Sequence, residues 1–222
     1  MSRRSGQAIR EHRARSLIAV LFILALFTSS ASAEFVVEVP VLAAFRGNDQ
    51  GVFEIMLFQW DHKASPDPIA LQWRQGGVIL GRGNLDSLVV AFRYAVERTP
   101  SVSHTGTVSV QGVTYVPTAS DGPSAGAAMA VGLIAMFKGD SVRRGVALTG
   151  TIQPDGTIGP VGAIPDKVRA AAREGCRIIL IPAGQLQDSR WNLVRLGFEL
   201  NVEIKEVSTI DDAYELMTGR RI

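Results

Sequence analysis

Histidine and cysteine are scarce in this sequence, which limits the chemistry that it can perform. Among 222 residues there are three histidines (His12, His62 and His104) and one cysteine. These residues do not have the spacing of metal ligands, so neither a metal site nor any other cofactor is expected. The lone Cys176 cannot form an internal disulfide, and the apolar run over 176–181 indicates a buried, inert thiol.

Nucleotide-binding patterns are also missing, and so is a real excess of basic residues. Neither the phosphate loop G-x-x-x-x-G-K-[ST] nor the dinucleotide pattern G-x-G-x-x-G occurs. The formal net charge is +2, but five arginines and one glutamate lie within residues 1–33, so the remainder carries a net charge of −2. No nucleic-acid-binding surface is therefore expected.

Residues 1–33 have the organisation of a secretory signal peptide. Five arginines precede an apolar stretch over 17–27, and residues 31–33 form an A-x-A cleavage pattern that leaves Glu34 as the first mature residue. An uncleaved membrane anchor is the alternative, although the apolar stretch is short for a span of about 20 residues. We therefore expect an exported protein, periplasmic or secreted, that meets a membrane only if the leader is retained.

Residues 34–222 are numerous enough for one domain with its own core. Strand-like and helix-like segments alternate without a clear linker, and hairpin turns join some of the strands. This organisation favours an α+β fold with mixed strands and packed helices. The sequence predicts strands at 35–44, 51–60, 107–116, 145–149, 177–181 and 201–207, and one more that ends at Leu80. It predicts helices at 85–97, 125–137, 165–174, 186–196 and 211–217.

The predicted helix at 85–97 has apolar residues at helical spacing. They predict one buried face, with Asn84 as the cap of the helix, and comprise Leu85, Leu88, Val89, Phe92 and Val96.

A serine at position 124 has the sequence setting of a nucleophile. Residues 122–126 spell G-x-S-x-G, a pattern in which the serine lies on a sharp turn before a helix. In hydrolases with this turn the chain order is serine, acid and then histidine, whereas every histidine here precedes Ser124. If Ser124 is a nucleophile, another group must accept its proton, and lysine is the remaining candidate.

Three lysines follow Ser124 in the sequence. Lys138 lies 14 residues downstream, which is roughly 21 Å along the predicted helix and too far for proton transfer. Lys205 is flanked by acids on the polar side of a predicted strand, and we expect it to be solvated. Lys167 lies in Ala-rich surroundings that permit close packing around its side chain. Spacing alone leaves the ordinary alternatives open, namely a helix-capping serine and an exposed lysine.

Three segments together resemble the proteolytic domain of the Lon proteases. They are DGPSAG at 121–126, ALTG at 147–150 and GTIGPVGAIPDK at 156–167. Their order fits that family, and the interval from the serine to the lysine fits without a gap. The resemblance covers roughly residues 80–218, whereas residues 34–79 match only in general character.

The resemblance implies a single Lon-type proteolytic domain in which Ser124 and Lys167 form a dyad of nucleophile and base. It implies that Thr149 hydrogen-bonds the lysine amine and orients its lone pair. For Asp121 two roles remain open. The carboxylate either shapes the loop and the substrate cleft, or pairs with the lysine in a resting state.

The residues next to the serine, Gly122, Pro123 and Ala125, belong to the same loop in this resemblance. Main-chain N–H groups near the start of the following helix are the expected oxyanion donors, supported by the helix dipole. The implied reaction is peptide hydrolysis through an acyl-enzyme on Ser124.

The sequence also departs from the family pattern. Thr151 and Ala163 replace an acid and a glycine of the usual motif, and the ATPase region of ATP-dependent Lon has no counterpart in these residues. We therefore expect an ATP-independent serine endopeptidase that acts on flexible or unfolded polypeptides, with a homo-oligomeric ring left open. The alternative is an exported, non-catalytic domain that binds peptides or partners on the same scaffold.

Overall fold

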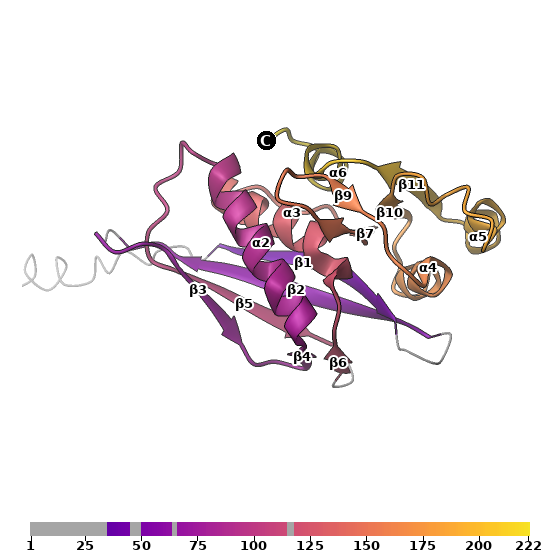
Figure 1. The fold of residues 1–222 in the computed structure, drawn as a ribbon, viewed down its shortest axis with the longest axis horizontal. Coiled ribbons are helices and arrows are strands. Elements are labelled where there is room, and N and C mark those ends of the chain that lie inside the picture. Colours follow the sequence, from indigo (N-terminus) through magenta and orange to yellow (C-terminus); the bar gives the residue numbers. More distant parts are fainter. Residues whose placement is uncertain (1–34, 45–49, 64–65, 115–117) are drawn as a thin grey trace, which may run out of the picture. The chain divides into compact units, whose positions relative to one another are not determined.

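The computed structural model describes residues 35–44, 50–63, 66–114 and 118–222, which form a mixed β-sheet with helices on both faces (Figure 1). The sheet has seven strands in the order β11-β10-β7-β1-β2-β5-β3, and the pairs β4-β6 and β8-β9 form two small sheets. The strands are β1 (Val36–Ala44), β2 (Gly51–Asp61), β3 (Ala70–Arg74), β4 (Val78–Leu80), β5 (Thr107–Val113), β6 (Thr118–Ser120), β7 (Val146–Leu148), β8 (Thr151–Ile152), β9 (Ile158–Gly159), β10 (Ile178–Pro182) and β11 (Glu203–Val207).

The large sheet has a mainly antiparallel half and a parallel half, which meet at β1. Strand β1 pairs antiparallel with β2 along its whole length, and β2 pairs antiparallel with β5. On its other side β1 pairs parallel with β7 at one position, Val41 opposite Leu148, and β7, β10 and β11 are mutually parallel. Within the described part of the chain, β1 after Val41 therefore has no ladder partner on the β7 side.

The helices divide between the two faces of the sheet. Val41 belongs to the larger hydrophobic cluster with α2, α3 and α6, whereas its neighbour Leu42 belongs to a second cluster with α4 and α5. This division follows from the alternation of side chains along a strand. The helices are α2 (Arg82–Arg98), α3 (Gly126–Lys138), α4 (Ile164–Arg173), α5 (Leu193–Leu200) and α6 (Ile210–Thr218), and η1 (Pro123–Ala125) is a 3₁₀ turn before α3.

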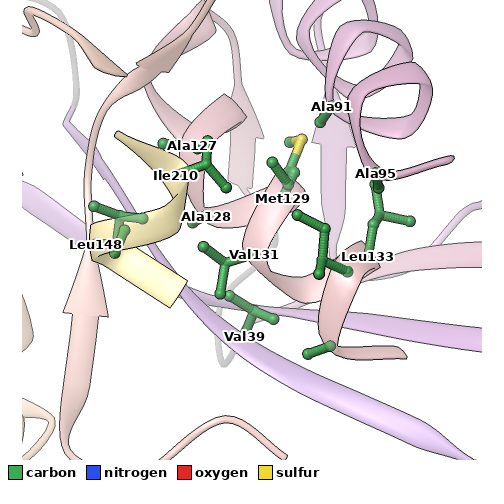
Figure 2. Close-up of a cluster of buried hydrophobic side chains, with 14 of the residues drawn as sticks. Val39, Ala91, Ala95, Ala127, Ala128, Met129, Val131, Leu133, Leu148 and Ile210 are labelled. Carbon is green, nitrogen blue, oxygen red and sulfur yellow. The ribbon is translucent and has the colours of Figure 1, made fainter. Parts of the chain in front are cut away.

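Helix α3 is the centre of the larger cluster and is buried on all sides. Residues 126–137 are all buried, as expected of a helix that is apolar around its whole circumference. Its small residues allow close approach to the sheet, because a Cβ on Gly132 would lie 2.5 Å from Val39 Cγ2. Figure 2 shows the side chains of α3 between Ala91 and Ala95 of α2 and Val39 of β1. The sequence thus places the N-terminus of α3, and Ser124 just before it, on a rigid element.

The observed architecture confirms the expected single α+β domain with mixed strands and packed helices. Most predicted segments coincide with observed elements to within a few residues. The strand predicted at 107–116 is shorter, ending at Val113, and residues 115–117 lie outside the described residues. In the parallel half, α4 and α5 lie on the connections that lead from β7 to β10 and from β10 to β11.

The helix predicted at 186–196 is wrong in its position. Helix α5 begins at Leu193, because the Asn192 side chain accepts a hydrogen bond of 2.9 Å from Arg195 N and caps the helix there. Residues 186–192 form turns instead, in which Trp191 Nε1 donates to Gln185 O.

The cap predicted for the helix at 85–97 is also wrong, and its buried face is only partly confirmed, since Leu88 is buried and Phe92 and Val96 pack against the larger cluster. Helix α2 begins at Arg82 with Gly81 as its N-cap residue, and Asn84 is buried inside it, where Nδ2 donates to Ser120 Oγ. Leu85 and Val89 are exposed. The buried face is made mainly of small residues that let α2 lie close to α3, a feature that apolar periodicity does not indicate. This face comprises Asn84, Ser87, Leu88, Ala91, Tyr94 and Ala95.

The predicted signal peptide at 1–33 lies outside the described residues. Across the ranges that the structure describes, no helix combines the length and apolar character needed to cross a membrane.

Candidate active site

Ser124 lies on the 3₁₀ turn η1, immediately before α3. Gly122, at the start of this turn, has φ of +120° and ψ of 160°, a backbone conformation that favours glycine. The Ser124 carbonyl oxygen accepts hydrogen bonds from Gly150 N (2.9 Å) and from Thr149 Oγ1 (3.3 Å). The turn is therefore anchored to the segment that follows β7, and the half-buried serine side chain is held at the N-terminal end of α3.

Lys167 lies near the start of α4 and is almost wholly buried. The exposed fraction of the residue is 3%. Its Nζ donates a hydrogen bond of 3.1 Å to Thr149 Oγ1. Burial lowers the pKa of the Lys167 amine from 10.5 to about 8, because the charged form loses solvation. A substantial fraction of this amine is thus neutral near pH 8.

Thr149 connects the lysine to the serine turn. The fully buried hydroxyl accepts from Lys167 Nζ and donates to the Ser124 carbonyl oxygen. The hydroxyl therefore acts as an acceptor towards Lys167 and as a donor towards the turn that carries Ser124. The residue follows β7 directly, at the place where β1 continues without a partner on the β7 side. Helix α4 belongs to one core cluster and α3 to the other, so the two side chains approach from opposite faces of the sheet.

Ser124 and Lys167 line the same cavity, which has a volume of about 610 Å³. Residues of β1 and β2 form one side, including Val41, Val52 and Met56. The segment from Ala119 to Ala125 forms the other side. Of the predicted loop residues, Asp121, Gly122 and Ala125 line the cavity, whereas Pro123 is exposed on η1. The volume suits a segment of peptide bound against the serine.

Asp121 holds the loop in place through main-chain contacts. Its Oδ1 accepts hydrogen bonds from Gly83 N at 2.9 Å and from Gly122 N at 2.8 Å. Gly83 lies in the first turn of α2, where unpaired N–H groups and the helix dipole favour a carboxylate. These contacts match the loop-shaping role among the two that the sequence left open.

The other lysines and the histidines lie elsewhere. Lys138 Nζ contacts the carbonyl oxygen of Arg221, and Lys205 pairs with Glu203 at 3.1 Å. His104 packs against Phe137 near the C-terminal end of α3, roughly 20 Å along the helix from Ser124. His12 lies outside the described residues. Among the lysines and the histidines that the structure describes, Lys167 is the one that lines the cavity with Ser124.

Three polar residues of the cavity, Glu54, Asn84 and Ser120, were not found as site residues by sequence reasoning. Asn84 was taken for a helix cap, and Glu54 lies in β2, which reads as an ordinary strand. The only signal for Glu54 was an acid on the otherwise apolar face of an alternating strand. Among the described residues, no cluster of three or more His, Cys, Asp or Glu side chains forms a place for a metal ion.

Comparison with known proteins relates the sequence of this chain to the Lon proteases. The family of the Lon protease (S16) C-terminal proteolytic domain matches residues 91–218. Lon protease 2 of Syntrophobacter fumaroxidans is 43% identical over 101 residues, which are 45% of this chain and 12% of that protein. The Lon protease of Azospirillum brasilense is 38% identical over 107 residues, 47% of this chain and 13% of that protein. The Lon protease of Methylocella silvestris is 46% identical over 96 residues, 43% of this chain and 12% of that protein. The chain thus spans only a small part of the length of these relatives.

The lowered pKa of Lys167 predicts how the stability of the fold depends on pH. The amine titrates near 10.5 when unfolded and near 8 when folded, so between these values the unfolded state binds more protons and the free energy of unfolding should rise with pH. At pH 7 the folded state carries a buried cation. Lys167→Met removes that cation, so it should raise the free energy of unfolding at pH 7 by about 2–3 kcal/mol, and by little at pH 10.5.

Urea unfolding of both proteins at pH 7 and pH 10.5 measures this difference. Lys205→Met is the control, because Lys205 is solvated and paired with Glu203, and it should show no comparable gain. A Lys167→Met protein that is no more stable than the parent at pH 7 would contradict a desolvated amine.

Proposed function

Because this chain belongs to the family of the Lon protease (S16) C-terminal proteolytic domain, we propose that it is a serine endopeptidase with Ser124 as nucleophile and Lys167 as base. The observation that carries this proposal is the buried lysine. Its amine has a lowered pKa, shares a cavity with Ser124 and is joined through Thr149 to the main chain of the serine. A desolvated lysine beside a serine is a recognised arrangement for activating the hydroxyl.

The reaction proceeds in two halves on Ser124. Neutral Lys167 Nζ takes the proton of Ser124 Oγ as the oxygen bonds to the scissile carbonyl carbon. The resulting ammonium gives that proton to the leaving nitrogen, the C–N bond breaks, and the acyl group remains on Oγ. A water molecule then loses a proton to Nζ, attacks the ester carbonyl and releases the acid, and the proton returns to Oγ.

The oxyanion is best placed at the N-terminal end of η1 and α3. The N–H groups of Gly126 and Ala127 already donate to Pro123 O and Gly150 O. We therefore assign the oxyanion donors to the N–H groups that precede them, at Ser124 and Ala125, where the helix dipole adds to the hydrogen bonds.

The dyad predicts a pattern of loss among point variants. Ser124→Ala and Lys167→Ala should each abolish peptide hydrolysis, and the double variant should lose no more, since both residues serve one step. Lys167→Arg should also be inactive, because a guanidinium does not release its proton in a protein. Peptide hydrolysis and labelling by a fluorophosphonate measure these effects, with Lys205→Arg as the matched control.

An active Lys167→Arg protein would exclude lysine as the base. A parent protein that neither cleaves peptides nor reacts with the fluorophosphonate would instead support the alternative, a non-catalytic domain that binds peptides.

The pH dependence of catalysis should follow the titration of Lys167. We expect kcat/KM to rise with pH through an apparent pKa near 8, because only the neutral amine accepts the serine proton. Thr149→Val removes the hydroxyl that holds Nζ, so it should lower kcat/KM without abolishing activity. Stopped assays from pH 5 to pH 10 give the profile. An ascending limb confined to about pH 4–5 would point to a carboxylate such as Asp121 instead.

For the substrate we propose polypeptide segments that are already flexible or unfolded. The resemblance in sequence and the family match concern the proteolytic domain alone, so unfolding by ATP hydrolysis has no basis in the described residues. When no unfoldase delivers the substrate, a serine beside a cavity of about 610 Å³ receives only chain that is locally extended. The leader-like residues 1–33 lead us to place this activity outside the cytoplasm, in the periplasm or the medium.

This proposal predicts which proteins are cleaved and under what conditions. The purified protein should digest a denatured substrate at least tenfold faster than the same substrate folded, and ATP with Mg²⁺ should change neither rate. Export predicts Glu34 at the N-terminus of the protein recovered from its own cell. Stimulation of folded-substrate digestion by ATP would overturn the proposed ATP independence. Recovery of a cytoplasmic protein that retains Met1 would overturn the proposed export. Ser124→Ala serves as the control for contaminating proteases.

A further inference from the structure

The side chain of Gln185 makes two hydrogen bonds to one residue that is far away in the sequence. Gln185 Oε1 accepts from Val161 N at 2.9 Å, and Gln185 Nε2 donates to Val161 O at 2.8 Å. The amide thus binds the main chain of Val161 as a neighbouring strand would. The exposed fraction of Gln185 is only 6%, so breaking this pair of hydrogen bonds would leave buried polar groups unpaired. We call the pair the Gln185 clamp.

Gln185 is itself held in place by the parallel half of the sheet. It lies in the turn that follows β10, where its N–H donates to Pro182 O at 3.4 Å. Its carbonyl oxygen accepts from Trp191 Nε1 at 3.3 Å. Strand β10 is paired on both sides, with β7 and with β11. The Gln185 clamp therefore ties Val161 to a fixed part of the fold.

Val161 belongs to the connection between β9 and α4, which forms part of the cavity wall. Gly162 and Ala163 follow it and line the cavity together with Ser124 and Lys167. Ala163 has φ of +53° and ψ of 37°, in the left-handed region that disfavours a residue with a Cβ atom. Such a conformation persists only where the surroundings impose it. The Gln185 clamp, two residues earlier, is a contact that can do so.

The same turn determines where α4 begins, and with it the position of Lys167. Ala163 is the N-cap residue of α4, and its carbonyl oxygen accepts a hydrogen bond of 3.2 Å from Lys167 N. From this first turn of the helix, Lys167 Nζ reaches Thr149 Oγ1 at 3.1 Å. If the turn before α4 relaxed, the start of the helix would shift, and the amine would lose this contact or gain water.

We propose that Gln185 is a positioning residue, which holds the turn before α4 so that the Lys167 amine stays buried against Thr149. This inference rests on the proposed peptidase function, in which the amine is the base. A glutamine that served the fold alone would contribute to stability and leave the properties of the amine unchanged. The two roles therefore differ in what a variant does to Lys167.

Kinetics of Gln185→Met test this role, because methionine has a similar length and makes neither hydrogen bond. At pH 8 kcat should fall by about tenfold or more, since a small displacement of the base is costly. The ascending limb of kcat/KM should move from near pH 8 to higher pH by about half a unit or more, since the amine gains solvation. Gln187→Met, at an exposed position two residues on, is the matched control and should change neither value.

A thermodynamic cycle tests the same point without any activity. At pH 7 Lys167→Met should stabilise the parent more than it stabilises Gln185→Met, because a better solvated ammonium is less unfavourable in the fold. The gain should shrink by about half or more in the Gln185→Met background, as measured by urea unfolding. The charges of Glu54 and Asp121 at the cavity, and of Asp166 beside the lysine, are present in all four proteins.

Loss of stability alone contradicts the proposal. A Gln185→Met protein that keeps the kcat, the pH profile and the full gain from Lys167→Met overturns the positioning role. If Gln185→Met does not fold, Gln185→Asn has its amide on a stem one methylene shorter and should show smaller changes in the same directions. Parent values in that variant overturn the role as well.

Failure of the peptidase function gives a different result. A parent protein that neither hydrolyses peptides nor reacts with the fluorophosphonate overturns the proposed function. The thermodynamic cycle then still decides whether Gln185 holds the Lys167 amine in its buried place.

Discussion

Desolvation of the Lys167 amine is the constraint on which the proposed site depends. A lysine in water is protonated at neutral pH and cannot accept a proton from a serine, so catalysis of this kind requires a surrounding that disfavours the cation. The structure supplies it by burial alone, since burial is the cause of the lowered pKa. The Thr149 hydroxyl then orients the amine by accepting a hydrogen bond from it. The fold thus holds an unfavourable group in its interior, as the proposed base requires.

The sheet makes such burial possible because the ladder that joins its two halves is very short. A continuous ladder between β1 and β7 would separate the helices on the two faces completely. The ladder is limited to one position, Val41 opposite Leu148, and the lysine of α4 approaches the serine turn where β7 ends. Helix α3 provides the opposing fixed point, because it is packed on all sides by the larger core. Two rigid elements from different core clusters thus present the reacting groups to one cavity.

Much of the fold was predictable from the sequence, and the exceptions have physical reasons. The apolar helix α3 and the alternating strands β1 and β2 are strong local patterns, so their positions were predicted closely. Helix α5 was misplaced because the cap at Asn192 outweighs the apolar residues before it. Ser124 and Lys167 came from a resemblance in sequence, since spacing alone favoured a capping serine and a solvated lysine. The hydrogen bonds of Asp121 to Gly83 and Gly122 join segments far apart in the chain, and only the structure could show which of its two roles those contacts match.

The candidate dyad and the far wall of its cavity come from different parts of this architecture. Ser124, Thr149 and Lys167 lie on the turn before α3, at the end of the parallel strand β7 and on α4. The far wall of the cavity belongs to the antiparallel pair β1 and β2, which contributes Val41, Val52, Glu54 and Met56. The hydrogen bonds that hold the Lys167 amine involve no residue of that pair. The sequence signature lies in the loops and helices around Ser124 and Lys167, whereas the far wall of the cavity is an ordinary pair of strands, so the signature by itself reveals little about the substrate.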